Sequence, residues 1–134
     1  VVASAALLLV AASWLPPYFA LRAQNAALAA AADGEVAVAL EHAHRAATWD
    51  PLAARPLLTE AMLLQQLGRN REAHARLQTA ARLQPQNYEV WYALGMLEHG
   101  VLGRDAAARS SFSRALALNP DDADNLYELR RLAQ

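Results

Sequence analysis

The fold is decided by residues 91–120, which read WYALGMLEHGVLGRDAAARSSFSRALALNP. Small and apolar residues recur there three and four positions apart, in two runs separated by the sequence Gly-Arg-Asp. Such spacing places them on one face of a helix, and the glycine between the runs favours a turn. The stretch therefore predicts two helices that pack against each other. The residues that we expect at the contact and at its end are Trp91, Leu94, Gly95, Ala108, Phe112, Ala115 and Pro120.

The second half of this pattern recurs twice upstream. Pro51, Pro85 and Pro120 are separated by 34 and 35 residues, and each follows small residues at the same distances. The extra residue of the third copy falls in the turn at 100–105, where an insertion costs little free energy. The equivalent alanines of the first two copies are Ala39, Ala46, Ala73 and Ala80.

This period, with its alanines, aromatic residue and proline, resembles the tetratricopeptide repeat family. Residues 91–95 also match the W-x2-L-G half of that family's pattern. The resemblance implies an all-α fold, a helix-turn-helix solenoid in which each helix pair buries its apolar face against its neighbours. Trp91 is expected to fill the core between paired helices, and Gly95 is expected to let them approach closely.

The expected domain, 18–134, contains about three repeats and a C-terminal capping helix. We place the repeats at 20–53, 54–87 and 88–122, and the cap at 122–134. Asp121 is expected to cap the last helix at its N-terminus. The expected helices are 18–32, 35–48, 54–67, 70–83, 88–99, 105–118 and 122–133.

A different pattern precedes the repeats. Residues 1–15, VVASAALLLVAASWL, have no charged side chain, but the run is shorter than the roughly 20 residues that span a bilayer. Because the chain also begins with valine, we expect 1–17 to be the truncated end of a transmembrane helix, with Trp14 and Tyr18 at the membrane interface. A buried helix of a soluble domain and the remnant of a signal or anchor are the alternatives.

Two prolines and few arginines follow the apolar run. Pro16 and Pro17 are expected to break or redirect the helix. The first basic residues beyond it are Arg22 and Arg45, so no arginine cluster flanks the run. Cytoplasmic ends of membrane helices carry such clusters. We therefore expect the repeats to lie outside the cytoplasm, tethered to the membrane through residues 1–15.

Composition excludes several classes of protein. The chain has no cysteine, which excludes a disulfide framework, a zinc-thiolate site and a cysteine nucleophile. Its 12 basic and 13 acidic residues give a net charge of −1, which argues against nucleic-acid binding. The four histidines, His42, His44, His74 and His99, lack the spacing of a metal site. With no catalytic motif in the sequence, we expect no catalytic residue, metal or cofactor, and a segment that is not an enzyme.

The resemblance implies a concave groove lined by the first helix of each pair. Methionine adapts to irregular partners and tyrosine combines contact area with a polar tip, so a protein or peptide ligand is expected there. The alternative is that these side chains pack between repeats or face water. The chaperone-tail variety of the family clamps a carboxylate with lysine and asparagine, but Arg55, Thr59 and Met62 take those places here, so that ligand is not expected. The candidate groove residues are Arg55, Leu58, Met62, Gln65, Glu89, Tyr92, Met96, His99, Tyr127 and Arg131.

A membrane helix followed by such repeats also resembles the C-terminal tail of bacterial O-antigen ligase or polymerase-type membrane proteins. Every basic residue is arginine, which suits a GC-rich bacterium. The leading hypothesis is a non-catalytic protein-interaction and scaffolding module on a bacterial membrane, the tail of a surface-polysaccharide ligase or polymerase. The alternatives are the regulatory tail of a membrane glycan-transferring enzyme whose active site lies upstream, and a singly anchored envelope assembly factor. The sequence leaves the oligomeric state open.

Overall fold

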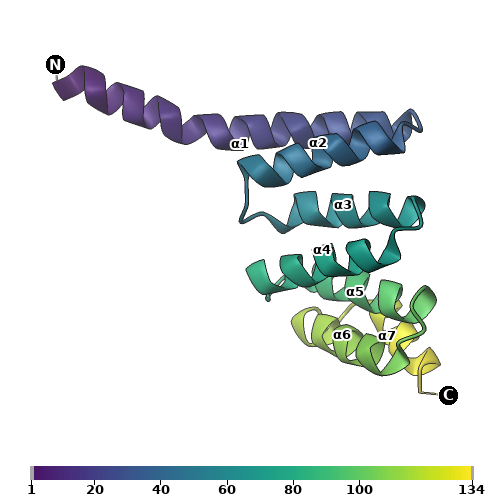
Figure 1. Cartoon of the computed structure of the whole chain (residues 1–134). Coiled ribbons are helices and arrows are strands. Elements are labelled where there is room, and N and C mark those ends of the chain that lie inside the picture. The colour runs from purple at the N-terminus through teal and green to yellow at the C-terminus, as the bar shows by residue number, and fades with distance from the viewer. Residues whose placement is uncertain (1, 134) are drawn as a thin grey trace.

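The computed structural model describes the backbone of residues 2–133 and the side chains of residues 17–133. The described residues form helices joined by short turns (Figure 1). The helices agree with the predicted ones to within two residues from the second helix onwards. Their bounds are α1 (Val2–Ala32), α2 (Val36–Trp49), α3 (Ala54–Gln66), α4 (Asn70–Leu83), α5 (Tyr88–Gly100), α6 (Asp105–Leu118) and α7 (Ala123–Arg131).

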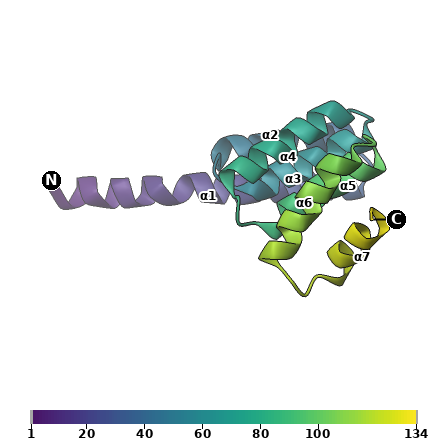
Figure 2. The ribbon, with the colours of Figure 1, turned by 90° about the horizontal axis from the view of Figure 1, so that it is seen from below.

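The helices stack as three antiparallel pairs, α1 with α2, α3 with α4 and α5 with α6, and α7 packs on α6 (Figure 1). Each pair also contacts the next through α2 with α3 and α4 with α5. Further contacts join α1 to α3 and α3 to α5. The odd-numbered helices therefore form one layer and the even-numbered helices the other (Figure 2). We call the exposed side of the first layer the inner face, and the exposed side of the second layer the outer face.

The core of this stack is built largely from alanine. The predicted alanines of all three copies have no exposed surface, and the turn prolines Pro51, Pro85 and Pro120 lie on the surface. Because a methyl group is the whole side chain, two helices that meet at alanines approach closely without losing side-chain entropy. The buried positions are Ala39, Ala46, Ala73, Ala80, Ala108 and Ala115.

The closest approach of two helices lies between α5 and α6. A Cβ atom added to Gly95 would lie only 2.6 Å from the Cδ1 atom of Phe112, whose side chain is fully buried. The ring of Tyr92 covers the same aromatic side chain, with 5.8 Å between the ring centroids. The role predicted for Gly95 is thus confirmed, because any side chain there would collide with the phenyl ring.

The turns between paired helices differ in length as predicted. Residues 67–69 join α3 to α4, whereas residues 101–104 join α5 to α6. Gly68 and Gly103 have φ angles of +71° and +62°, which residues with a side chain rarely adopt. The insertion in the third repeat therefore lies in a turn and leaves the packed helices unchanged.

The prediction for Trp91 was wrong in part. Its side chain is half-buried and forms one wall of a cavity between α4 and α6, and its Nε1–H donates a hydrogen bond to the carbonyl oxygen of Pro85 at 2.9 Å. Leu94 and Phe112 fill the core instead. An indole keeps its polar N–H near a partner or solvent, and the turn carbonyl supplies that partner at the edge of the core.

The prediction that Pro16 and Pro17 break the first helix was also wrong, because α1 continues through both. The fixed φ of proline is itself helical, so the cost is a missing hydrogen bond and a ring clash with the preceding turn. A bend relieves that clash, and Figure 1 shows α1 bending where it leaves the stack.

Among the residues whose side chains are described, no helix is both long and apolar enough to cross a membrane. The apolar run 1–15, predicted as the end of a transmembrane helix, lies outside those residues.

A small correction concerns the last helix. The carboxylate of Asp122, one residue after the predicted Asp121, accepts a hydrogen bond from the backbone N–H of Asn125 at 3.0 Å. Arg130 and Arg131 lie in the last turn, where positive charge is favourable.

Candidate functional site

The residues predicted to line a groove all lie on α3, α5 and α7, in the inner layer. Four of them, Leu58, Gln65, Tyr92 and His99, are half-buried. The exposed ones are Arg55, Met62, Glu89, Met96, Tyr127 and Arg131.

Three exposed apolar side chains form a row across the inner face. Met62 and Met96 are 62 % and 42 % exposed, and Leu28, which is 34 residues before Met62, is 54 % exposed. Because they occupy the same repeat position on α1, α3 and α5, we call them the inner-face row. Exposed apolar side chains that gather on one surface mark an interaction site. Sequence reasoning missed Leu28, although its 34-residue spacing from Met62 and of Met62 from Met96 was readable.

One end of the inner face is acidic. Glu89 on α5 and Asp124 on α7 are 35 residues apart, occupy equivalent repeat positions and are both exposed. Burial, together with the negative charges of Asp124, Glu128 and Asp122, raises the pKa of Tyr92 above its ordinary value of 10.0. The basic residue at this end, Arg131, is paired with Glu128 at 3.1 Å. The α5–α7 end of the inner face therefore favours positively charged groups.

Some of the predicted residues stabilise the stack. Leu58 packs against the buried core between the second and third pairs, and Tyr92 packs against Phe112. The Nδ1 atom of His99 lies 2.7 Å from a carboxylate oxygen of Asp105, across the turn between α5 and α6. These contacts fit the alternative reading, in which such side chains pack within the stack.

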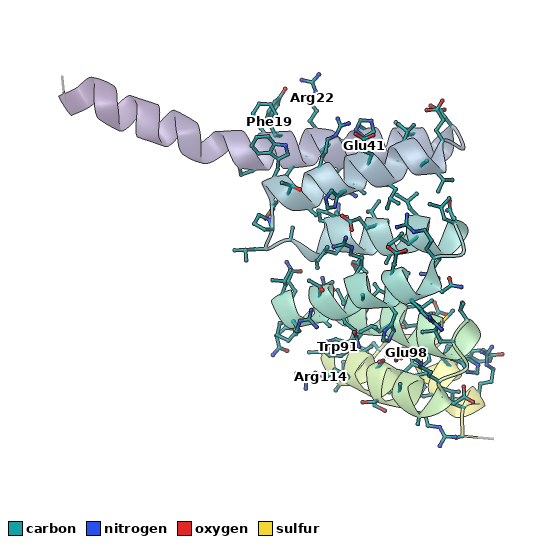
Figure 3. The ribbon with its side chains drawn as sticks, viewed as in Figure 1. Phe19, Arg22, Glu41, Trp91, Glu98 and Arg114 are labelled. Atoms are coloured by element: carbon teal, nitrogen blue, oxygen red, sulfur yellow. The ribbon has the colours of Figure 1, made fainter. Side chains whose placement is uncertain are left out.

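The outer face contains two cavities at equivalent repeat positions, each with a buried glutamate that the sequence reasoning missed. The first is about 190 Å³ in volume and lies between α2 and α4. Its Glu60 accepts a hydrogen bond from Arg76 Nε at 2.8 Å and lies 3.2 Å from His44 Nδ1. The cavity between α4 and α6 is about 270 Å³. At its base the Glu98 carboxylate lies 2.9 Å from His74 Nε2 and accepts a hydrogen bond from Ser111 (Figure 3).

Glu60 could have been found from the sequence. It stands 34 residues before Leu94, a core position, and a carboxylate at a core position must be paired. No group of three or more histidine and carboxylate side chains is placed to hold a metal ion among the described residues. Each of His44, His74 and His99 contacts one carboxylate.

The raised pKa of Tyr92 predicts a loss of stability at high pH. A raised pKa in the folded state means that the folded protein holds this proton more tightly than the unfolded chain. The resulting stabilisation is complete below the ordinary value of 10.0 and is lost as the pH rises through the raised pKa. Tyr92→Phe is therefore expected to lose less unfolding free energy than the wild type between about pH 9 and pH 11, as measured by urea denaturation. Parallel curves for the two proteins would contradict this.

The comparisons with known proteins agree with this architecture. A family model described as tetratricopeptide repeat matches residues 58–123. No curated protein sequence matches the chain. Among solved structures, the first such repeat domain of Spaghetti (RPAP3), bound to the HSP90 peptide SRMEEVD, superposes with a TM-score of 0.78 at 19 % identity, covering 86 % of this chain and 90 % of that one.

Two further structures are similar. The second repeat domain of human RPAP3, in complex with the HSP70 peptide SGPTIEEVD, has a TM-score of 0.79 at 20 % identity over 89 % of this chain and 98 % of that one. The repeat domain of Arabidopsis OM64 has a TM-score of 0.79 at 18 % identity over 88 % and 97 %. Residues 58–123 therefore carry tetratricopeptide repeats, and the helix pairs on either side of them share the fold of that family.

Proposed function

We propose that the repeats are a protein-interaction module that binds an extended segment of a partner protein on the inner face. A tetratricopeptide fold suggests such a module, and two of the similar structures hold peptides. The observation that carries the proposal is the inner-face row, Leu28, Met62 and Met96, repeated at the same position on three successive helices. Side chains spaced in this way suit a ligand that runs along the stack with its own apolar residues against each repeat.

The charge of the inner face selects the partner. The peptides in the similar structures end in EEVD and are acidic. Here Glu89 and Asp124 expose carboxylates beside Tyr92, and like charges brought together cost free energy. We infer that the partner segment combines apolar and basic residues, and that acidic chaperone tails are rejected.

Peptide binding tests this proposal directly. The probes are three fluorescent peptides: SRMEEVD, a peptide of alternating leucine and lysine, and one of alternating leucine and aspartate. The leucine–lysine peptide is expected to bind about tenfold more tightly than either acidic peptide, a difference of about 1.4 kcal/mol, in fluorescence anisotropy. Equal or tighter binding of SRMEEVD would contradict the inferred partner.

The inner-face row itself is tested with Met62→Ala combined with Met96→Ala. Both side chains are exposed, so the fold is expected to survive, while the leucine–lysine peptide loses its apolar contacts and binds about tenfold more weakly. Leu67→Ala is the matched control, because Leu67 is an exposed apolar residue in a turn outside the row. Equal effects of the two changes would show that the peptide binds elsewhere.

The membrane tether through residues 1–15, and the position of the repeats outside the cytoplasm, are part of the same proposal. Fifteen residues without a charge support it, because such a run is costly in water. Vesicle flotation, the first step of the docking experiment below, tests it. The tail of a surface-polysaccharide ligase or polymerase, and the lack of enzymatic activity, stay predictions of the sequence.

A further inference from the structure

An aromatic cluster lies where α1 meets the end of α2. The ring of Phe19 packs against Trp49, with 5.0 Å between centroids, and against the edge of Tyr18 at 5.5 Å. Tyr18 is 58 % exposed and Trp49 is 47 % exposed. Figure 3 shows Phe19 on α1 at the end of the stack from which the N-terminal part of the helix projects. Two large amphipathic rings are thus held in the open by packing that fixes their position.

Arginines lie beside this cluster. A cavity of about 390 Å³ is lined by Phe19, Trp49, Arg22, His42 and Arg45 together with two alanines. Arg45 is paired with Glu41, four residues earlier on α2, and Arg22 extends from α1 into solvent (Figure 3). Aromatic rings with arginines behind them are the composition of a membrane interface, where rings lie at the headgroups and arginines meet phosphates.

The distance along α1 places this cluster at the right depth. The uncharged run ends at Leu15 and α1 continues without a break. At 1.5 Å per residue, Phe19 lies about 6 Å beyond Leu15 and Arg22 about 10 Å beyond it. Each polar layer of a bilayer is about 5–8 Å thick. If the uncharged run ends at the edge of the hydrocarbon, Phe19 lies in the headgroup layer and Arg22 at its outer border.

The neighbouring turn belongs to the same edge of the stack. Leu52, in the turn between α2 and α3, is 71 % exposed. The side-chain amide of Gln84, at the end of α4, donates a hydrogen bond to its carbonyl oxygen at 3.1 Å, so the next turn lies alongside. Figure 1 shows this edge on the side from which α1 projects. The turn that contains Leu67 lies at the other end of α3, about 20 Å away.

We propose that this edge of the repeats rests on the bilayer. The aromatic cluster, Arg22 and Leu52 contact the lipid headgroups, so the stack runs along the membrane surface. This inference rests on the proposed tether through residues 1–15. Its support is that one continuous helix joins the uncharged run to the aromatic cluster, and that arginine charge complements lipid phosphate.

Site-directed spin labelling tests the docking. The chain has no cysteine, so Leu52→Cys and Leu67→Cys each give one labelling site, at opposite ends of α3 in exposed turns. The full chain is mixed with vesicles of phosphatidylcholine and phosphatidylglycerol, floated, and examined by power-saturation EPR. The label at Leu52 is expected to be more accessible to oxygen than to a water-soluble nickel complex, and the label at Leu67 is expected to show the reverse.

The outcomes separate the two proposals. A chain that fails to float with vesicles overturns the tether and the docking together. A chain that floats with both labels more accessible to nickel overturns the docking and leaves the tether standing. Arg22→Gln with Arg45→Gln is expected to shift the label at Leu52 towards nickel accessibility while flotation persists, and no shift would remove the arginines from the contact. Circular dichroism of each labelled chain confirms the fold.

Discussion

Replacing Phe112 with alanine is expected to lower the free energy of unfolding by about 3–5 kcal/mol. The phenyl ring is fully buried, fills the space that the absent side chain of Gly95 leaves, and lies in a cluster with Ala108 and Leu132. Neighbours this small and this tightly placed can close little of the resulting cavity. Urea denaturation followed by circular dichroism measures the loss.

The matched control lies on the same helix. Ser113 is exposed on α6, so Ser113→Ala is expected to change the free energy of unfolding by less than about 0.5 kcal/mol. Gly95→Ala is expected to cost about 1–3 kcal/mol through its collision with Phe112, and less when Phe112→Leu is also present, because residues in contact are coupled. A loss of under about 1 kcal/mol in Phe112→Ala would contradict the packing of α5 on α6.

Most of the repeat stack could be predicted because its signal is periodic. The 34-residue spacing of Pro51 and Pro85 fixes the register of every helix from α2 onwards, and the alanines before each proline mark the buried face. What failed is local. Pro16 and Pro17 were expected to end a helix, but the rule describes a cost that a bend can relieve. The capping residue was off by one, as helix ends commonly are.

The inner face was only partly predictable. The pattern places Met62 and Met96 on one surface, but the first repeat lacks the aromatic and glycine marks, so Leu28 was not aligned with them. Pro17 stands 34 residues before Pro51 and would have given that register. The acidic end of the face depends on where α7 brings Asp124 relative to α5, which periodicity alone does not show.

The buried carboxylates were the least predictable feature. Hydrophobic patterns treat a core position as apolar, and the partners of Glu60 come from two other helices. His44 is 16 residues before it on α2, and Arg76 is 16 residues after it on α4. A pairing of this kind becomes visible only when the three helices are placed side by side.

Arg76→Met is accordingly expected to lower the free energy of unfolding by about 3 kcal/mol, the second largest effect of a single change. The side chain of Glu60 is only 2 % exposed, and the change leaves its carboxylate buried with His44 alone. Methionine keeps most of the packing of the arginine stem, so the loss reports the charge. Urea denaturation at neutral pH measures it, with Arg71→Met, an exposed arginine on the same helix, as the control.

The double change Glu60→Met with Arg76→Met distinguishes a structural ion pair from a requirement for charge. Removing both partners takes away the cost of burying a carboxylate as well as the attraction that offsets it, so the double variant is expected to be within about 1 kcal/mol of the wild type. If Arg76→Met costs no more than Arg71→Met, water in the adjoining cavity solvates Glu60 and the pair contributes little. If the double variant is as unstable as Arg76→Met alone, the arginine acts through packing between α3 and α4, and the buried charge is not the cause.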